Sequence, residues 1–142
     1  MLLQPKRVKY RKVQKGRIRK IAQRGYTLDV GTFGLKALEP CWLTSRQLEA
    51  IRIAISRKTK REGIIYLRVF PEKGLTKKPA EVRMGSGKGS PDSFVCVIEP
   101  GRIIYEIEGV SKKLAQEAFR LADSKIGIKT KMVIREDYIN PS

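Results

Sequence analysis

The amino-acid sequence predicts an α+β fold in which two helices pack on one face of an antiparallel or mixed sheet. Two segments, one after Thr44 and one after Ser111, place apolar residues at the spacing of an amphipathic helix. Five or six other segments show the apolar alternation, or the short apolar runs, that are typical of strands. Turn residues such as Pro100-Gly101 separate neighbouring segments and therefore predict hairpins, with mostly antiparallel pairing.

The first predicted strands lie between residues 26 and 43. Apolar and polar residues alternate over 26–30, which predicts a half-buried strand. The glycines at 31 and 34 predict a turn or bulge, and a second short strand is expected at about 35–39. Residues 41–43 form an apolar patch that leads into the first helix.

The first predicted helix begins at Thr44 or Ser45, and Thr44 with Gln47 has the spacing of a capping box. The helix is expected to end near Gly63, since glycine favours helix ends. One face is predicted to enter the core through Leu48, Ile51 and Ile55.

The opposite face of this helix is basic and carries few acids, which favours contact with RNA phosphates. A merely solvated charged face is the open alternative. The predicted RNA contacts are Arg46, Arg57, Lys60 and Arg61.

The second half of the chain predicts further strands around one long irregular segment. A strand is expected at 64–70, and 71–93 is predicted to lack regular structure because proline and glycine recur there. An irregular stretch of that length inside a domain usually carries function. Strands are then expected at 94–98 and 102–107, and a last strand at 128–135.

A second helix is predicted at 112–125, with Ser111 as its cap and Gly127 after its end. Acids partly balance its cations, so it is predicted to serve mainly as a core element. The residues expected to face inward are Leu114, Ala118, Leu121 and Ala122.

Positive charge is concentrated at the start of the chain. The 142 residues carry a net charge of +17, of which residues 1–71 supply +14 (18 − 4) and residues 72–142 supply +3 (13 − 10). Nucleic acid is the usual partner of such a surplus, and an anionic membrane surface is the alternative. No apolar run approaches the roughly 20 residues that a membrane span needs, and no secretory or transit leader is expected from the first residues.

Residues 1–24 contain ten cations and no acid, too little apolar surface to fold alone. We predict an extended arm that orders against a polyanion, with a disordered solubilising tail as the alternative. Tyr10 and the spaced apolar residues are expected to anchor it. Residues 25–135 are predicted to form one RNA-binding domain, and 136–142 a tail. The arm residues expected to bind RNA are Lys6, Arg7, Lys9, Arg11, Lys12, Lys15, Arg17, Arg19, Lys20 and Arg24.

The run from Val82 to Pro91 has three glycines at alternate positions, two cations and no acid. Glycine lets another molecule approach the backbone closely, and successive N–H groups can then turn toward an anion. We predict a loop that closes on a phosphate-rich ligand, and a flexible solvated hairpin loop is the alternative. The candidate residues are Arg83, Met84, Gly85, Ser86, Gly87 and Lys88.

The composition disfavours an enzyme. The chain has no histidine, the commonest general base and metal ligand. Gly87-Lys88 is not followed by Ser or Thr, and Val82 stands where a Walker loop needs glycine. Glu106 and Glu108 share one strand face, but we predict that they pair with Arg or Lys rather than act as a catalytic pair. No cofactor or metal is expected.

The two cysteines, Cys41 and Cys96, lie far apart in the sequence and have apolar neighbours. They are predicted to be buried thiols rather than a disulfide or a metal pair.

Several segments, in order, resemble the bacterial-type large-subunit ribosomal protein L-sixteen family, and the resemblance covers nearly the whole chain to about Val133. The most specific segments are Pro5-Lys6-Arg7, Phe33-Gly34-Leu35-Lys36-Ala37, Leu43-Thr44-Ser45-Arg46-Gln47-Leu48-Glu49-Ala50, Arg68-Val69-Phe70-Pro71, Arg83-Met84-Gly85-Ser86-Gly87-Lys88-Gly89 and Pro100-Gly101-Arg102.

This resemblance implies a structural constituent of the large ribosomal subunit. It implies contact with large-subunit rRNA near the peptidyl-transferase centre and with neighbouring large-subunit ribosomal proteins. It also implies that the loop at 82–91 helps to position A-site tRNA, and that the arginine matching Arg83 is a site of hydroxylation in some bacterial members. No homo-oligomer is expected.

The segments Leu38-Glu39-Pro40 and Gly87-Lys88-Gly89-Ser90-Pro91 look most like the plastid branch of that family. The expected location is the ribosome of the chloroplast stroma, and the bacterial cytoplasm is the alternative. A free RNA-binding or chaperone protein outside the ribosome remains the alternative function.

Overall fold

The computed structural model describes residues 3–85 and 87–136 and has an α+β fold, as the sequence predicts. Within the described residues, the strands form two antiparallel sheets, with orders β3-β6-β1-β7 and β2-β5-β4. The elements are β1 (Phe33–Ala37), β2 (Cys41–Thr44), α1 (Ser45–Lys58), β3 (Ile64–Leu67), β4 (Lys73–Lys77), β5 (Ser90–Ile98), β6 (Ile103–Glu108), α2 (Lys112–Asp123) and β7 (Thr130–Ile134).

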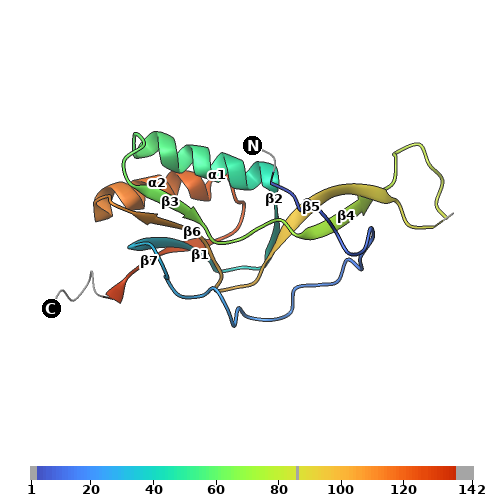
Figure 1. The fold of residues 1–142 in the computed structure, drawn as a ribbon, viewed down its shortest axis with the longest axis horizontal. Coiled ribbons are helices and arrows are strands. Elements are labelled where there is room, and N and C mark those ends of the chain that lie inside the picture. Colours follow the sequence, from blue (N-terminus) through green and yellow to red (C-terminus); the bar gives the residue numbers. More distant parts are fainter. Residues whose placement is uncertain (1–2, 86, 137–142) are drawn as a thin grey trace.

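Figure 1 shows how these elements are arranged. The two helices lie side by side over the four-stranded sheet, and the β4–β5 hairpin extends away from it. The N-terminal segment, drawn in blue, starts near the beginning of α1, passes the hairpin and returns beneath the sheet to β1. The first part of the arm therefore lies beside the hairpin, and its last part lies beneath the sheet.

The core lies between the helices and the sheets. Leu48, Ile51 and Ile55 of α1 are fully buried, which confirms the predicted inner face. The prediction for α2 was partly wrong, because Leu121 is 41% exposed whereas Phe119 is buried. Both residues fit helical spacing, and the face that buries the larger Phe119 ring removes more apolar area from water.

The capping box at the start of α1 is present as predicted. The Thr44 hydroxyl accepts a hydrogen bond from the Gln47 backbone N–H at 3.2 Å, and the Gln47 side chain accepts one from the Thr44 N–H at 3.0 Å. These bonds satisfy backbone donors that the first turn of a helix leaves without partners. They fix the point where β2 turns into α1.

Replacing Thr44 by alanine is expected to lower the free energy of unfolding by about 1 kcal/mol, because it removes the hydroxyl that accepts from the Gln47 N–H. Urea denaturation of the full chain measures the change. Ser45→Ala, one residue inside the helix, is the matched control and should change stability by less than about 0.5 kcal/mol. Equal effects of the two substitutions would contradict the role of the cap.

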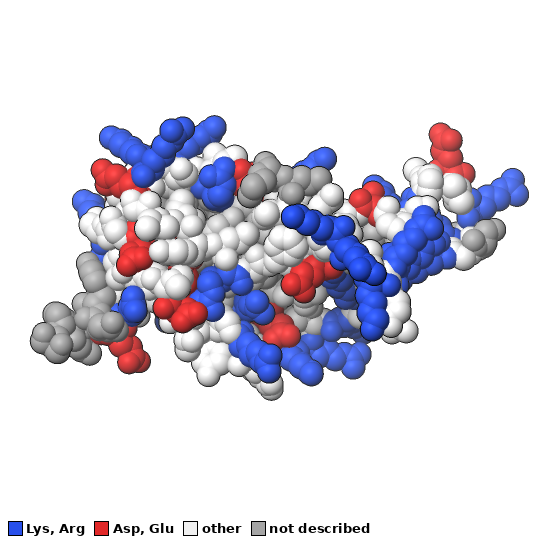
Figure 2. All heavy atoms as spheres, in the orientation of Figure 1, with Lys and Arg blue, Asp and Glu red and all other residues white. Residues whose placement is uncertain are grey.

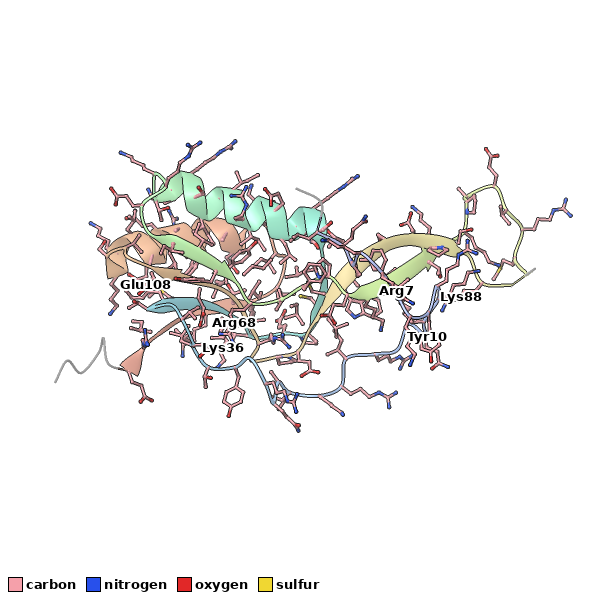
Figure 3. All side chains as sticks on the ribbon, in the orientation of Figure 1. Arg7, Tyr10, Lys36, Arg68, Lys88 and Glu108 are labelled. Carbon is pink, nitrogen blue, oxygen red and sulfur yellow. The ribbon has the colours of Figure 1, made fainter. Side chains whose placement is uncertain are left out.

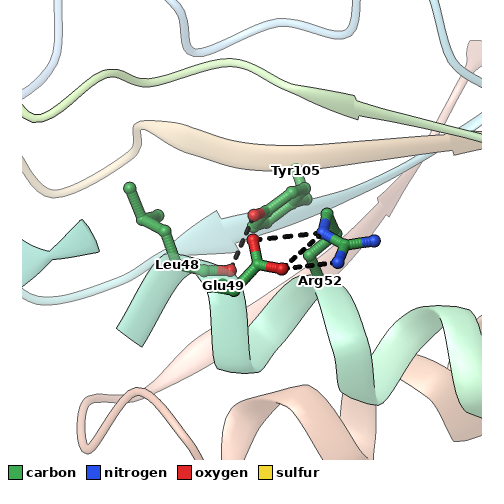
Figure 4. A network of polar contacts seen from close by, with 4 residues as sticks. All are labelled: Leu48, Glu49, Arg52 and Tyr105. Atoms are coloured by element: carbon green, nitrogen blue, oxygen red, sulfur yellow. Dashed lines mark hydrogen bonds and ion pairs between the residues drawn. The ribbon is translucent and has the colours of Figure 1, made fainter. Parts of the chain in front are cut away.

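A buried hydroxyl connects α1 to the sheet. The Tyr105 hydroxyl of β6 donates to the Leu48 carbonyl at 2.7 Å, and Figure 4 shows this bond beside the Glu49–Arg52 pair. Burial raises the pKa of the Tyr105 hydroxyl, which favours the neutral donor. The bond gives the buried hydroxyl of Tyr105 an acceptor and fixes the position of α1 against β6.

The strand predicted at 26–30 is absent, and a side chain binds this backbone instead. The Glu106 carboxylate of β6 accepts hydrogen bonds from the backbone N–H groups of Asp29, at 2.7 Å, and Val30, at 3.3 Å. It also pairs with the Arg68 guanidinium at 3.0 Å, which confirms the pairing predicted for Glu106. The segment is thus fixed without a strand partner. The same pairing prediction for Glu108 was wrong within the described residues, because its carboxylate accepts a hydrogen bond from the Tyr66 hydroxyl and forms no ion pair.

The stretch 71–93, predicted to be irregular, contains β4 and the first part of β5. Register runs from Lys73 opposite Val95 to Lys77 opposite Ser90, with an irregularity between Leu75 and Thr76. The irregular part is therefore limited to 71–72 and to the described residues of 78–89. Glycine and proline in the stretch disfavour strands locally, but pairing across the hairpin outweighs that preference.

Other boundaries differ from expectation by a few residues. β1 includes residues 33 and 34, where a turn or bulge was predicted, and β2 occupies the predicted apolar patch. β3 ends at Leu67 rather than at 70, and α1 ends at Lys58, before the predicted stop at Gly63. The buried Thr59 closes α1, since its hydroxyl donates to the Ile55 carbonyl at 3.0 Å.

Candidate nucleic-acid interface

The arm is an extended segment in which residues 3–24 form no helix or strand. All ten of its predicted RNA contacts, from Lys6 to Arg24, are exposed. Within the described residues, none of them pairs with a carboxylate. Figure 2 shows basic side chains gathered along the arm and around the hairpin, with few acids among them. A polyanion would meet this surface without displacing internal ion pairs.

The arm is attached to the domain at several points along its length. The Ala22 N–H donates to the Pro100 carbonyl at 2.9 Å, and the Lys12 ammonium donates to the Lys88 carbonyl at 3.0 Å. In return, the Lys88 ammonium donates to the Val13 carbonyl. Tyr10 was expected to anchor the arm, but its side chain is 64% exposed, with the Lys9 ammonium 5.5 Å from its ring centroid.

A second attachment lies where the arm passes Trp42. The Lys15 ammonium is 5.4 Å and the Lys73 ammonium 5.1 Å from the indole centroid, and Lys73 also donates to the Lys15 carbonyl. Cations over an indole face are attracted by the charge distribution of the ring. Trp42 thereby joins the arm to β4.

The basic face of α1 is divided by internal ion pairs. Arg52 pairs with Glu49, and this hydrogen bonding lowers the pKa of the Glu49 carboxyl; Lys58 pairs with Glu117 at 3.2 Å. The four residues predicted to contact RNA have no carboxylate partner in the part of the chain that the structure describes, and all are exposed; they are Arg46, Arg57, Lys60 and Arg61. The α1 cations predicted as RNA contacts are therefore free of the internal ion pairs that occupy Arg52 and Lys58.

The end of α1 presents three of these cations around one hollow. Arg57, Lys60 and Arg61 line a cleft of about 610 Å³ together with Arg52 and Ser56. Lys60 and Arg61 have positive φ angles of 54° and 64°, which non-glycine residues adopt at a cost. This backbone turns both side chains out of the helical path.

The loop at 78–89 holds its glycine-rich part away from the domain. Arg83 is exposed, and Met84 is fully exposed. Gly85 and Gly87 have positive φ angles of 107° and 91°, with open space where a Cβ would stand. Ser86 lies outside the described residues. The exposed positions leave room for a partner close to the backbone.

The base of the loop is more constrained than its tip. The Lys78 ammonium donates to the Gly85 carbonyl at 2.7 Å, across the loop. A Cβ on Gly89 would lie 2.8 Å from the carbonyl carbon and oxygen of Lys77, so only glycine fits there. Lys88, which was predicted to face tRNA, also contacts the arm through its ammonium group and its carbonyl (Figure 3).

Three basic residues of this region were not predicted from the sequence as candidate contacts. They are Lys73, Lys77 and Lys78. Their stretch was assigned as irregular, so no face or pairing could be attributed to them. The arm contacts of Lys73 and Lys88 connect positions distant in sequence, and no local pattern indicates them.

The thiols do not add chemistry to this surface. Cys96 is buried and Cys41 half-buried, and both are free, as predicted. Burial raises the pKa of the Cys41 thiol to about 11 and that of Cys96 to about 12, which disfavours the reactive thiolate. Within 3–85 and 87–136, no helix has the length and apolar character needed to cross a bilayer.

An α+β domain with an exposed cationic arm, a basic helix end and a projecting hairpin defines a nucleic-acid-binding protein. The family model of ribosomal protein L16p/L10e matches residues 5–133. The chain therefore belongs to the L16p/L10e family of ribosomal proteins, as its resemblance to the L-sixteen family implied. It is a structural constituent of the large ribosomal subunit, with rRNA and neighbouring ribosomal proteins as its partners.

Proposed function

We propose that the arm and the basic face of α1, from Arg46 to Arg61, bind large-subunit rRNA near the peptidyl-transferase centre. The observation that carries this proposal is the set of exposed cations without carboxylate partners on both elements. Phosphates that bind there gain charge-assisted hydrogen bonds at little desolvation cost to the protein. Structured RNA is recognised largely through its shape, phosphates and 2′-hydroxyl groups, so few base-specific contacts are expected on this surface.

Binding of this kind releases counterions from the RNA, so affinity should fall steeply with salt. The slope of log K against log salt is roughly −0.7 to −0.9 for each phosphate neutralised. With about eight phosphates engaged, affinity would fall by about three decades or more from low to moderate salt.

The glycine-rich loop is proposed to contact A-site tRNA. Arg83 carries this role, because a planar guanidinium can clamp a phosphate or stack on a base. Its side chain is exposed and makes no ion pair within the described residues. Lys88 is proposed to position the base of the loop through its bonds to the arm.

Replacing Arg83 by alanine is expected to weaken A-site tRNA binding about tenfold, since it removes one charge-assisted contact, and to leave incorporation into the subunit unchanged. Large subunits reconstituted with the variant are tested by sedimentation and then by tRNA binding. Arg120→Ala, an exposed arginine on α2, is the matched control and should bind tRNA normally. Normal tRNA binding by the Arg83 variant would contradict the role of the loop.

The competing function is that of a free RNA chaperone outside the ribosome. Cosedimentation in a salt gradient separates the two, because a subunit constituent moves with large subunits at moderate salt. Protein found only in ribosome-free fractions would refute the main proposal.

The plastid ribosome is the proposed location. The segments Leu38-Glu39-Pro40 and Gly87-Lys88-Gly89-Ser90-Pro91 support it through their resemblance to the plastid branch. Detection of the chain by mass spectrometry in ribosomes purified from chloroplasts tests the location, and its recovery from bacterial ribosomes instead would overturn it.

A further inference from the structure

A groove of about 700 Å³ runs between the arm and the three-stranded sheet. The arm contributes one wall, through residues between Pro5 and Val13, and the floor comes from Val69, Phe70, Gly74 and 94–97. Figure 3 shows Arg7 and Tyr10 on the arm where it passes the hairpin. Neither the capping box nor the loop uses this groove, so it is available for a separate ligand.

The floor of the groove is apolar and partly aromatic. Phe70 is 42% exposed, Val97 is 37% exposed, and Phe94 is half-buried beside them in the lining. Tyr10 adds a third aromatic ring, 64% exposed, from the arm. Exposed aromatic faces are suited to stacking against a planar group.

The rim of the groove is cationic. Glu72 is the one acid in the lining, against five cations: Arg7, Lys9, Arg11, Lys73 and Arg102. Arg102 is partly exposed in this lining, and its Nε packs beside Gly25 with no hydrogen-bond partner among the described residues. This charge disfavours a basic peptide and favours a phosphate-bearing ligand.

We propose that this groove binds one unpaired nucleotide of the rRNA, with its base against Phe70 and its phosphate held by Arg102 and the arm cations. The inference rests on the proposed rRNA-binding function and adds a defined site to it. Unstacked bases in RNA loops and bulges characteristically stack on aromatic side chains, while cations hold their phosphates. The volume lies within the range of about 300–1,000 Å³ typical of small-ligand sites, which suits a single nucleotide.

Two substitutions in the full chain distinguish the contact with the base from the contact with the phosphate. Phe70→Leu keeps the apolar surface but removes the ring, and is expected to weaken binding to deproteinised large-subunit rRNA about tenfold without changing the salt slope. Arg102→Met is expected to weaken it about tenfold and to reduce the slope by roughly one.

The matched controls lie outside the groove. Tyr26→Leu removes another exposed ring, 49% exposed in the protein, and Arg120→Met removes another exposed arginine. Each should change rRNA affinity less than about twofold, as surface positions usually do. Groove variants that bind rRNA like their controls would overturn the proposal.

A photoreactive benzoylphenylalanine at position 70 provides a readout that does not depend on the stability of the Arg102 variant. Irradiation of the complex with rRNA should crosslink this residue to one unpaired nucleotide. Crosslinks only to base-paired nucleotides, or none at all, would overturn the site. If arm variants outside the groove lose rRNA binding while groove variants retain it, the groove proposal fails alone. Retention by both would refute the proposed function as well.

Discussion

Replacing Arg17, Arg19, Lys20 and Arg24 together by glutamine is expected to lower the affinity of the full chain for large-subunit rRNA by roughly a thousandfold at low salt. All four are exposed, and none pairs with a carboxylate within the described residues. None lines the groove between the arm and the three-stranded sheet. If each contact with a phosphate contributes ~1 kcal/mol, the four together contribute ~4 kcal/mol. Filter binding over a salt series should also show a slope reduced by about three.

The control for this experiment has the same net charge. Glutamine at Lys112, Lys113, Arg120 and Lys125 also leaves +13 (17 − 4), but removes exposed cations on and beside α2, outside the proposed surface. This variant should lose affinity only because the total positive charge of the protein is lower, and the loss should be less than about tenfold. Similar losses in the two variants would show that total charge, and not the arm, determines binding.

Glu106→Gln is expected to lower the free energy of unfolding by about 3 kcal/mol, since breaking a buried ion pair leaves an uncompensated charge. The Glu106 side chain is fully buried and its Arg68 partner is 22% exposed, so solvent relieves only part of the cost. The same carboxylate holds the backbone at Asp29 and Val30. Differential scanning calorimetry should show a melting temperature lower by roughly 10 °C.

Glu108→Gln is the control on the same strand. Glu108 is only partly buried and accepts one hydrogen bond from the Tyr66 hydroxyl at 3.2 Å, which an amide oxygen can also accept. The Glu108→Gln substitution should lower the free energy of unfolding by less than about 1 kcal/mol. A Glu106 variant as stable as the Glu108 variant would show that the segment at 26–30 is held by other contacts.

The parts of the fold that depend on near neighbours could be predicted from sequence. The capping box of Thr44 and Gln47 joins residues three apart, and Leu48, Ile51 and Ile55 follow from helical spacing. The available cations of α1 also follow from local sequence, because Glu49 lies within reach of Arg52 on the same helix.

The errors arose where a distant partner decides the structure. Alternation at 26–30 is real, yet Glu106, far away in sequence, satisfies that backbone and removes the need for a strand partner. β4 was missed because its stability comes from pairing with β5 across the loop, whereas its own residues favour a turn.

The candidate interface divides in the same way. A block of ten cations without an acid predicts the arm, but the path of the arm past Trp42 and the hairpin depends on bonds from Lys12, Lys73 and Lys88. The groove with Arg102 at its rim exists only because these segments meet, so no stretch of sequence predicts it.

The chain carries a single tryptophan, and two lysine ammonium groups, one from the arm and one from β4, lie over its ring. Its emission therefore depends on whether the arm rests on the domain or has moved away. Mixing the unlabelled chain with rRNA in a stopped-flow fluorimeter would report this movement in real time. The order of docking and arm rearrangement thus becomes a kinetic quantity that needs no attached dye.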